Sequence, residues 1–223
     1  AITVLQSAPL VASQLESAIL PARVQGYHPT QLDTLLAAGE VVWRGLSPLG
    51  DRDGRIALFL TDEAPQLFQP AGRGAELSPR AAQILEVLKK QGASFFAPLH
   101  EAVAEETLAP SGATVDALWE LLFHGLISND GLAPLRAYLR GAAQRGNRLE
   151  SGDGSLTQRP TRRALSTGGF RSRRTECPPA AAGRWVLVSD PPPSDTIYAA
   201  ALCKTLLARY GVLTKLGLST EAV

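Results

Sequence analysis

The sequence predicts a mainly α-helical protein with small β hairpins, arranged as tandem helix-turn-helix modules. Short amphipathic helices alternate with turn residues along much of the chain, and two strand-forming runs surround a turn-rich loop. Those runs, Val41–Trp43 and Ile56–Leu60, flank a loop that contains proline, glycine and aspartate. A predicted helix leads directly into this hairpin, whose tip is basic. Helix followed by hairpin is the order found in a winged helix.

Composition places the chain among globular proteins. Hydrophobic residues make up 45% of its 223 residues and charged residues 19%. Neither an apolar run of about 20 residues nor a secretory signal is present, so we expect no membrane association. Cys177 and Cys203 lack disulfide or metal-ligand spacing, which favours a reducing cytoplasm. The chain starts at Ala1 and contains no methionine, so we expect it to be a piece of a longer protein.

The first winged-helix module is predicted over residues 1–61. Apolar residues recur at helical spacing from Val11 to Ile19, and Pro21 ends that pattern. A second helix is predicted from Pro29 to Ala38, because proline suits the first turn and Gly39 the stop. The hairpin then completes the module. Residues 62–77 are rich in proline and glycine and are predicted to be a linker.

The second helix-turn-helix or winged-helix module is predicted over residues 78–140. Its helices are expected from Ser78 to Gln91, from Ser94 to Val103 and from Thr114 to Phe123, with a further helical run from Ala133 to Leu139. Periodicity then disappears, and residues 141–182 are predicted to be an Arg-rich flexible loop.

The remaining residues are predicted to close the second module and to begin another. Residues 183–190 form the expected return strand of a second wing, and residues 194–223 the truncated start of a further helical module. Its helix, Ser194 to Tyr210, places Cys203 on an apolar stripe, so Cys203 is interpreted as a core residue. Trp43, Trp119 and Trp185 lie in apolar runs and are also expected in the core.

No pattern in the chain predicts catalysis, a cofactor or a metal. A phosphate-binding loop of the G-x-x-x-x-G-K-[ST] type is absent, and the three histidines are scattered. The paired acids Asp51 and Asp53 are interpreted as turn residues, and Glu105 and Glu106 as a solvated edge. Catalytic residues therefore stay unknown.

Basic residues supply the candidate sites for nucleic acid. Eight arginines and three acidic residues lie between 144 and 176, and three more arginines lie in or beside the hairpin loop. Such side chains contact phosphates or stack on unpaired bases, while the helix before the hairpin faces a groove. The open alternatives are a solvated hairpin tip and an unstructured insertion. The candidate residues are Thr30, Gln31, Arg44, Arg52, Arg55, Arg162, Arg163, Arg171, Arg173 and Arg174.

Several phrases, in order along the chain, resemble the large helicase-related (Lhr) family of bacterial DNA helicases, in the region C-terminal to the motor. They include Leu-Pro-Ala-Arg-Val at 20–24, Gly-Glu-Val-Val-Trp-Arg-Gly at 39–45, Asp-Gly-Arg-Ile-Ala-Leu-Phe-Leu-Thr-Asp-Glu-Ala-Pro at 53–65 and Gly-Leu-Ile-Ser-Asn-Asp at 125–130. Gly-Arg-Trp at 183–185 and Arg-Tyr-Gly-Val-Leu-Thr at 209–214 also match. After Lys215 the chain departs from the family pattern, which indicates a truncation.

The resemblance implies an ATP-dependent DNA-repair helicase with two RecA-like motor domains upstream. ATP and Mg²⁺ would belong to that parent motor, since this chain has none of the motor motifs. We therefore expect this chain to bind DNA, single-stranded or duplex, and to position it for the motor domains. The alternatives are a scaffold that packs on the motor, and part of a glycosylase-like domain that excises bases and is completed by missing sequence.

Overall fold

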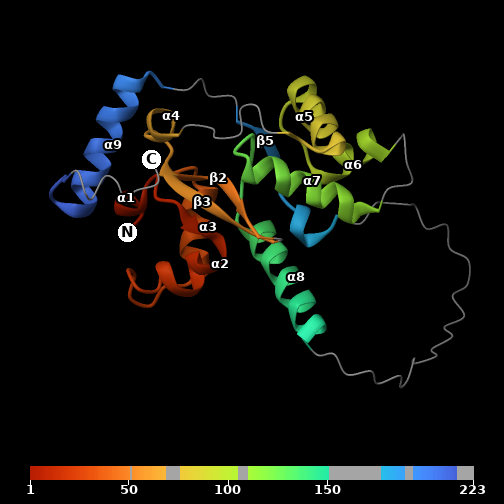
Figure 1. The fold of residues 1–223 in the computed structure, drawn as a ribbon, viewed down its shortest axis with the longest axis horizontal. Coiled ribbons are helices and arrows are strands. Elements are labelled where there is room, and N and C mark those ends of the chain that lie inside the picture. The colour runs from red at the N-terminus through yellow and green to blue at the C-terminus, as the bar shows by residue number, and fades with distance from the viewer. Residues whose placement is uncertain (51, 69–75, 105–109, 151–176, 189–192, 215–223) are drawn as a thin grey trace, which may run out of the picture.

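The computed structural model describes residues 1–50, 52–68, 76–104, 110–150, 177–188 and 193–214, with only the backbone for 142–150. Two small antiparallel sheets are surrounded by helices (Figure 1). The predicted fold class, mainly helical with small β hairpins in tandem winged-helix modules, is confirmed.

The first module has the element order of a winged helix. Helix α1 (Ile2–Leu5) precedes strand β1 (Leu10–Val11), and the first helix of the helix-turn-helix follows as α2 (Ala12–Gln14) and the π-helical turn η1 (Leu15–Ile19). Helix α3 (Pro29–Ala37) is the second helix and leads into strands β2 and β3. The sheet order is β1-β3-β2, so β3 is the central strand.

The hairpin has longer strands than the sequence predicted. Strand β2 covers Val41–Leu49 and β3 covers Asp53–Leu60, so three residues connect the two strands. Pro48 is tolerated within β2 because this strand lies at the sheet edge, and Gly50 turns the chain with a φ of 64°. Arg44 and Arg55 therefore lie within strands, and only Arg52 lies in the turn.

Part of the predicted linker 62–77 is folded. Helix α4 (Ala64–Leu67) follows β3 directly, and both Leu67 and the adjacent Phe68 are buried. The Phe68 ring meets the Phe59 ring edge-on with 5.8 Å between centroids. These apolar side chains cover one face of the central strand, which explains why the segment is ordered despite its prolines.

The second module repeats the winged-helix order. Helices α5 (Pro79–Gln91), α6 (Phe96–Ala104) and α7 (Ser111–Phe123) precede strand β4 (Ile127–Asn129), which pairs antiparallel with β5 (Trp185–Leu187). The Ser78 hydroxyl caps α5 by accepting a hydrogen bond from the Ala81 N–H. Ser94 bridges to Trp185 on the other side of β5, as the first strand of a winged helix does.

The connection between β4 and β5 contains more helix than predicted. Helix α8 covers Ala133–Glu150, continuing through Gly141, where the sequence predicted the loop to start. It runs away from α5 and α6, and the turn η2 (Pro179–Ala181) returns the chain to β5 (Figure 1). The middle of the predicted Arg-rich loop lies outside the described residues.

One hydrophobic core joins the two modules. Trp43 from the first module packs beside Trp119 of α7, with 6.5 Å between ring centroids, and Trp185 meets Trp119 edge-on at 5.8 Å. All three tryptophans are buried, as predicted. The hairpin approaches α7 so closely that a Cβ on Gly45 would overlap the Leu122 carbonyl oxygen.

The last described helix, α9 (Asp195–Tyr210), packs on the first module. Its buried residues are Thr205 and Leu206, with Leu202 packed against the cluster that contains Phe59 and Phe68. Arg209 fixes the helix end by donating to the carbonyl oxygens of Val4 and Gln6 at 2.9 and 2.6 Å.

The prediction that Cys203 is a core residue is wrong, because its side chain is exposed. Leu206 from the same predicted stripe is buried, but Leu202 is the neighbour that packs on the cluster of Phe59 and Phe68, so the buried face of α9 is rotated away from Cys203. Among the helices described, none combines the length and the apolar character needed to cross a membrane.

The close packing of hairpin and α7 gives a stability prediction. Gly45→Ala should lower the free energy of unfolding by about 3 kcal/mol, because the added methyl group meets a backbone carbonyl that cannot move aside. Gly112→Ala is the matched control: its Cβ would meet nothing within 4 Å, so stability should rise by about 0.5 kcal/mol. Urea unfolding followed by circular dichroism measures both. Equal effects at the two glycines would contradict this packing.

Candidate nucleic-acid interface

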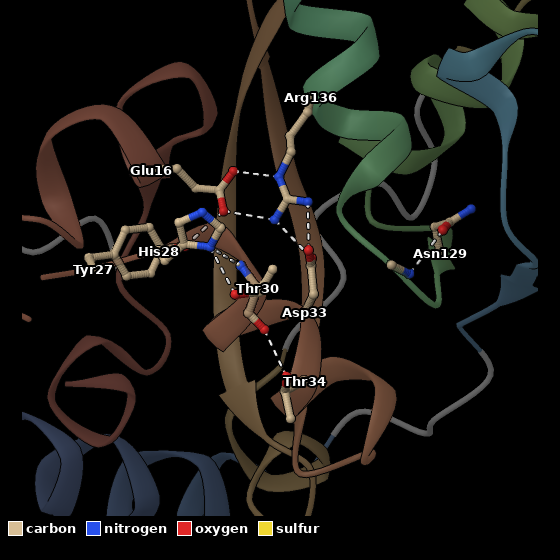
Figure 2. Close-up of polar contacts among 9 residues, drawn as sticks. Glu16, Tyr27, His28, Thr30, Asp33, Thr34, Asn129 and Arg136 are labelled. Atoms are coloured by element: carbon tan, nitrogen blue, oxygen red, sulfur yellow. Dashed lines mark hydrogen bonds and ion pairs between the residues drawn. The ribbon is translucent and has the colours of Figure 1, made fainter.

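The start of α3 is fixed by a capping box. The backbone N–H of Thr30 donates to Nδ1 of His28 at 3.4 Å, and the Thr30 hydroxyl lies 2.8 Å from the same nitrogen (Figure 2). In return, the His28 N–H donates to Oε1 of Gln31 at 3.1 Å. Thr30 and Gln31, both predicted to contact nucleic acid, are exposed and also hold the end of this helix.

Helix α3 has one buried face and one open face. Leu32 and Leu36 are buried in the core, which fixes the roll of the helix. Thr34, one turn after Thr30, is exposed and donates its hydroxyl to the Thr30 carbonyl at 2.8 Å. The open face therefore carries small polar side chains, the kind that hydrogen-bond to phosphates and base edges.

Behind α3, Arg136 of α8 binds two carboxylates of the first module. Its Nε and Nη2 donate to Glu16 at 2.6 and 2.8 Å, and its Nη1 and Nη2 donate to Asp33 at 2.9 and 2.8 Å (Figure 2). The Tyr27 hydroxyl donates to Glu16 at 2.8 Å. Both helices of the first helix-turn-helix are thus fixed to α8 by one guanidinium group.

The cluster changes the ionisation of its members. The hydrogen bond to Glu16, more than any other interaction, holds the pKa of Arg136 above its ordinary value, and Asp33 adds to this against the opposing effect of burial. Burial, followed by the hydrogen bond to Glu16, raises the pKa of the Tyr27 hydroxyl. Arg136 therefore stays charged and Tyr27 stays a donor at neutral pH.

The three predicted hairpin arginines separate into two groups. Arg44 and Arg55 lie on the same face of the sheet, because Arg44 pairs with Ala57, two residues from Arg55. Arg55 is exposed, whereas Arg44 is half-buried with its guanidinium carbon 5.8 Å from the Phe68 ring centre. Arg55 is thus the better placed of the two to contact a phosphate.

Arg52 points into the protein instead. Its Nη2 lies 3.4 Å from Oδ1 of Asp116 on α7, and its guanidinium carbon lies 5.4 Å from the Tyr138 ring centre on α8. Its side chain is only 21% exposed. The remaining predicted residues, Arg162, Arg163, Arg171, Arg173 and Arg174, lie outside the described residues.

A hollow of about 300 Å³ remains between the hairpin tip and α7. Its carboxylates have structural partners: Asp53 accepts from the Ser13 N–H and hydroxyl, and Glu120 accepts from the Ser78 N–H and hydroxyl. Across the part of the chain that the structure describes, no group of His, Cys, Asp and Glu is arranged to hold a metal ion.

No pattern in the sequence predicts the Arg136 cluster. Arg136 lies 120 residues from Glu16 and 103 from Asp33, and each of them alone looks like an ordinary polar position on a helix surface. Only the packing of α8 on the first module brings them together.

Comparison with known proteins agrees with the winged-helix geometry. Residues 1–61 match the family model described as the winged-helix domain of large helicase-related protein. Over 220 residues, 98% of the chain, it is 37% identical to a protein of Mycolicibacterium smegmatis named "Lhr helicase/ probable uracil glycosylase". The chain belongs to the Lhr family.

A second Lhr relative supports the assignment along nearly the whole chain. The Escherichia coli protein named "Lhr helicase/uracil glycosylase" is 34% identical over 217 residues, 96% of this chain. In both cases the match covers 14% of the relative's length, so the chain spans about a seventh of these Lhr proteins.

The Arg136 cluster should contribute to stability. Arg136→Ala leaves two facing carboxylates without their counter-charge, so we expect the free energy of unfolding to fall by about 2 kcal/mol. Arg136→Lys should lose less, since it keeps the charge but not the planar double contact. Urea unfolding at neutral pH measures both. As a control, Lys89→Ala removes an exposed pair with Glu86 and should change little; an equal loss there would contradict the assignment.

Tyr27 should make stability depend on alkaline pH. Because its pKa is raised in the folded state, its contribution is complete below the ordinary tyrosine value of about 10 and is lost as pH rises above it. The free energy of unfolding should therefore fall more steeply between about pH 9 and about pH 11 for the wild type than for Tyr27→Phe. Chemical unfolding over that range measures the difference. Parallel curves would exclude Tyr27 as the titrating group.

Proposed function

We propose that this chain is a DNA-binding part of an Lhr-type helicase and that it positions nucleic acid for a motor that lies outside it. The observation that carries the proposal is the open polar face of α3. In helix-turn-helix proteins this second helix enters the major groove and its exposed residues contact base edges. Here Leu32 and Leu36 hold α3 from behind, while Thr30, Gln31 and Thr34 face outward.

Charge around α3 is compatible with an approaching phosphate backbone. Asp33 would repel phosphates if its charge were uncompensated, but Arg136 neutralises it through two hydrogen bonds. Arg55 is an exposed positive charge on the hairpin, but it lies on the face of β3 that carries Ala57 and Phe59, opposite the face that packs on α3, so it would contact a different part of the phosphate backbone. Helix α3 itself presents no lysine or arginine, so additional affinity would come from elsewhere, and the predicted Arg-rich residues from 162 to 174 are the candidates.

ATP hydrolysis belongs, in this proposal, to the longer protein. The relatives are named as helicases and uracil glycosylases, and this chain corresponds to 14% of their length. Its sequence has no phosphate-binding loop, so we assign ATP and Mg²⁺ to motor domains upstream and DNA repair to the whole protein. Base excision would likewise require residues beyond this chain.

A scaffold role is the second candidate, favoured by the hairpin. Ile56, Ala57, Leu58 and Phe59 are all buried, so both faces of β3 are covered by protein. A wing packed in this way supports neighbouring domains. The two roles are compatible only if α3 remains open in the whole protein.

DNA binding separates the two candidates. The chain should bind fluorescein-labelled DNA with an affinity that falls as salt rises, and Arg55→Ala should weaken binding about threefold for any sequence while reducing the log–log salt slope by about 1. Fluorescence anisotropy at several salt concentrations measures both. Lys89→Ala, which removes an exposed charge on α5, is the control and should leave binding unchanged. Absence of binding, or binding insensitive to salt, would favour the scaffold.

A further inference from the structure

We infer that the two modules present a single DNA-reading helix, α3, because the corresponding side of α7 is the docking site for the first module's hairpin. The inference rests on the proposed function, since it states which of two equivalent helices meets DNA. Helices α3 and α7 occupy the same position in their modules: each is the last helix before the first strand of the hairpin.

Burial distinguishes the two helices. Two of the nine residues of α3 are buried, which leaves a full face open. Eight of the thirteen residues of α7 are buried: Thr114, Val115, Ala117, Leu118, Trp119, Leu121, Leu122 and Phe123. They recur at i, i+1, i+3 and i+4, which covers most of the helix circumference, and a helix covered in this way cannot enter a groove.

The hairpin is the element that covers α7. Gly45 lies against the backbone of Leu122, and Gly54 lies against the ring of Phe123, so that a methyl group at either glycine would overlap α7. Beside them, the hydroxyl of Ser128 donates to the Trp43 carbonyl at 2.8 Å in a buried position. Contacts this close leave no space between the first module's wing and the second module.

Electrostatics at the hairpin tip also disfavour DNA beside α7. The side chains that α7 leaves accessible include Asp116, which is 60% exposed, and Glu120, and both are acidic. Arg52 binds Asp116 and lies over Tyr138, so this arginine serves protein packing. A phosphate group here would be repelled by Asp116 and Glu120, and the adjacent Arg52 already binds Asp116.

Space at this location excludes a nucleic-acid strand. The hollow between the hairpin tip, α7 and α8 measures about 300 Å³, the size of a site for one small molecule. A duplex could reach the side of α7 that carries Leu122 and Phe123 only if the hairpin left it, which would expose Trp43 and Trp119 to water. The paired modules thus form one body in which the second module is the platform and the first carries the reading helix.

Matched charge substitutions test the inference. Thr34→Glu puts a negative charge on the open face of α3, and Gly112→Glu puts the same charge on the exposed first turn of α7, where a Cβ meets nothing within 4 Å. We expect Thr34→Glu to weaken duplex binding at least tenfold and Gly112→Glu to change it less than twofold, by fluorescence anisotropy at constant salt. Circular dichroism checks that both variants are folded. A loss at Gly112→Glu as large as at Thr34→Glu would overturn the inference.

A tether provides an independent test of docking. In a background with Cys177 and Cys203, both exposed, changed to serine, Arg52→Cys and Asp116→Cys are joined by a short bismaleimide. We expect rapid intramolecular linkage and unchanged duplex affinity afterwards. Failure of linkage, or loss of binding on linkage, would overturn the inference while leaving the proposed function intact.

If the untethered wild type does not bind DNA at all, the proposed function itself fails. Successful linkage would in that case still show that the hairpin is docked on α7.

Discussion

The packing of the β2–β3 hairpin against α7 is the contact on which the arrangement of the molecule depends. Glycine at 45 and 54 lets the strand backbones touch α7, and this approach brings Trp43 beside Trp119 in a core shared by both modules. With a side chain at either glycine the two modules would be held apart. Trp43 and Trp119 would then lose their burial in the shared core, and this burial is the main way in which they stabilise the folded protein.

The hairpin is consequently the centre of the structure rather than its periphery. One face of β3 contributes Ile56 and Leu58 to the shared core, while the other face contributes Ala57 and Phe59 to a second cluster beneath α4 and α9. Winged-helix hairpins are usually pictured as free edges that contact a DNA backbone. Here two-sided burial makes the hairpin a structural core, and its turn arginine binds an aspartate of the same chain.

Two copies of one fold thus differ in what covers their equivalent helices within this Lhr region. The first module keeps the helix of its helix-turn-helix open, and Arg136 fixes that helix from behind while neutralising Asp33. The second module buries its equivalent helix in the junction. Fold alone does not assign function, since the difference lies in what covers each helix. In the proposed role, the pair would hold DNA in one orientation relative to the motor.

The sequence by itself determined the local structure and the family. Proline and Ser78 mark helix starts, Gly92 marks a stop, and the apolar runs around the three tryptophans identify the core, because each depends on backbone preferences or on short-range periodicity. Tertiary structure alone decided the partners of Arg52 and Arg136, which lie 64 and more than 100 residues away, and which face of α9 is buried. Sequence pattern shows that a side chain is charged or apolar. What it faces depends on how distant elements pack, and in this protein that packing leaves Arg55 exposed while Arg52 binds Asp116.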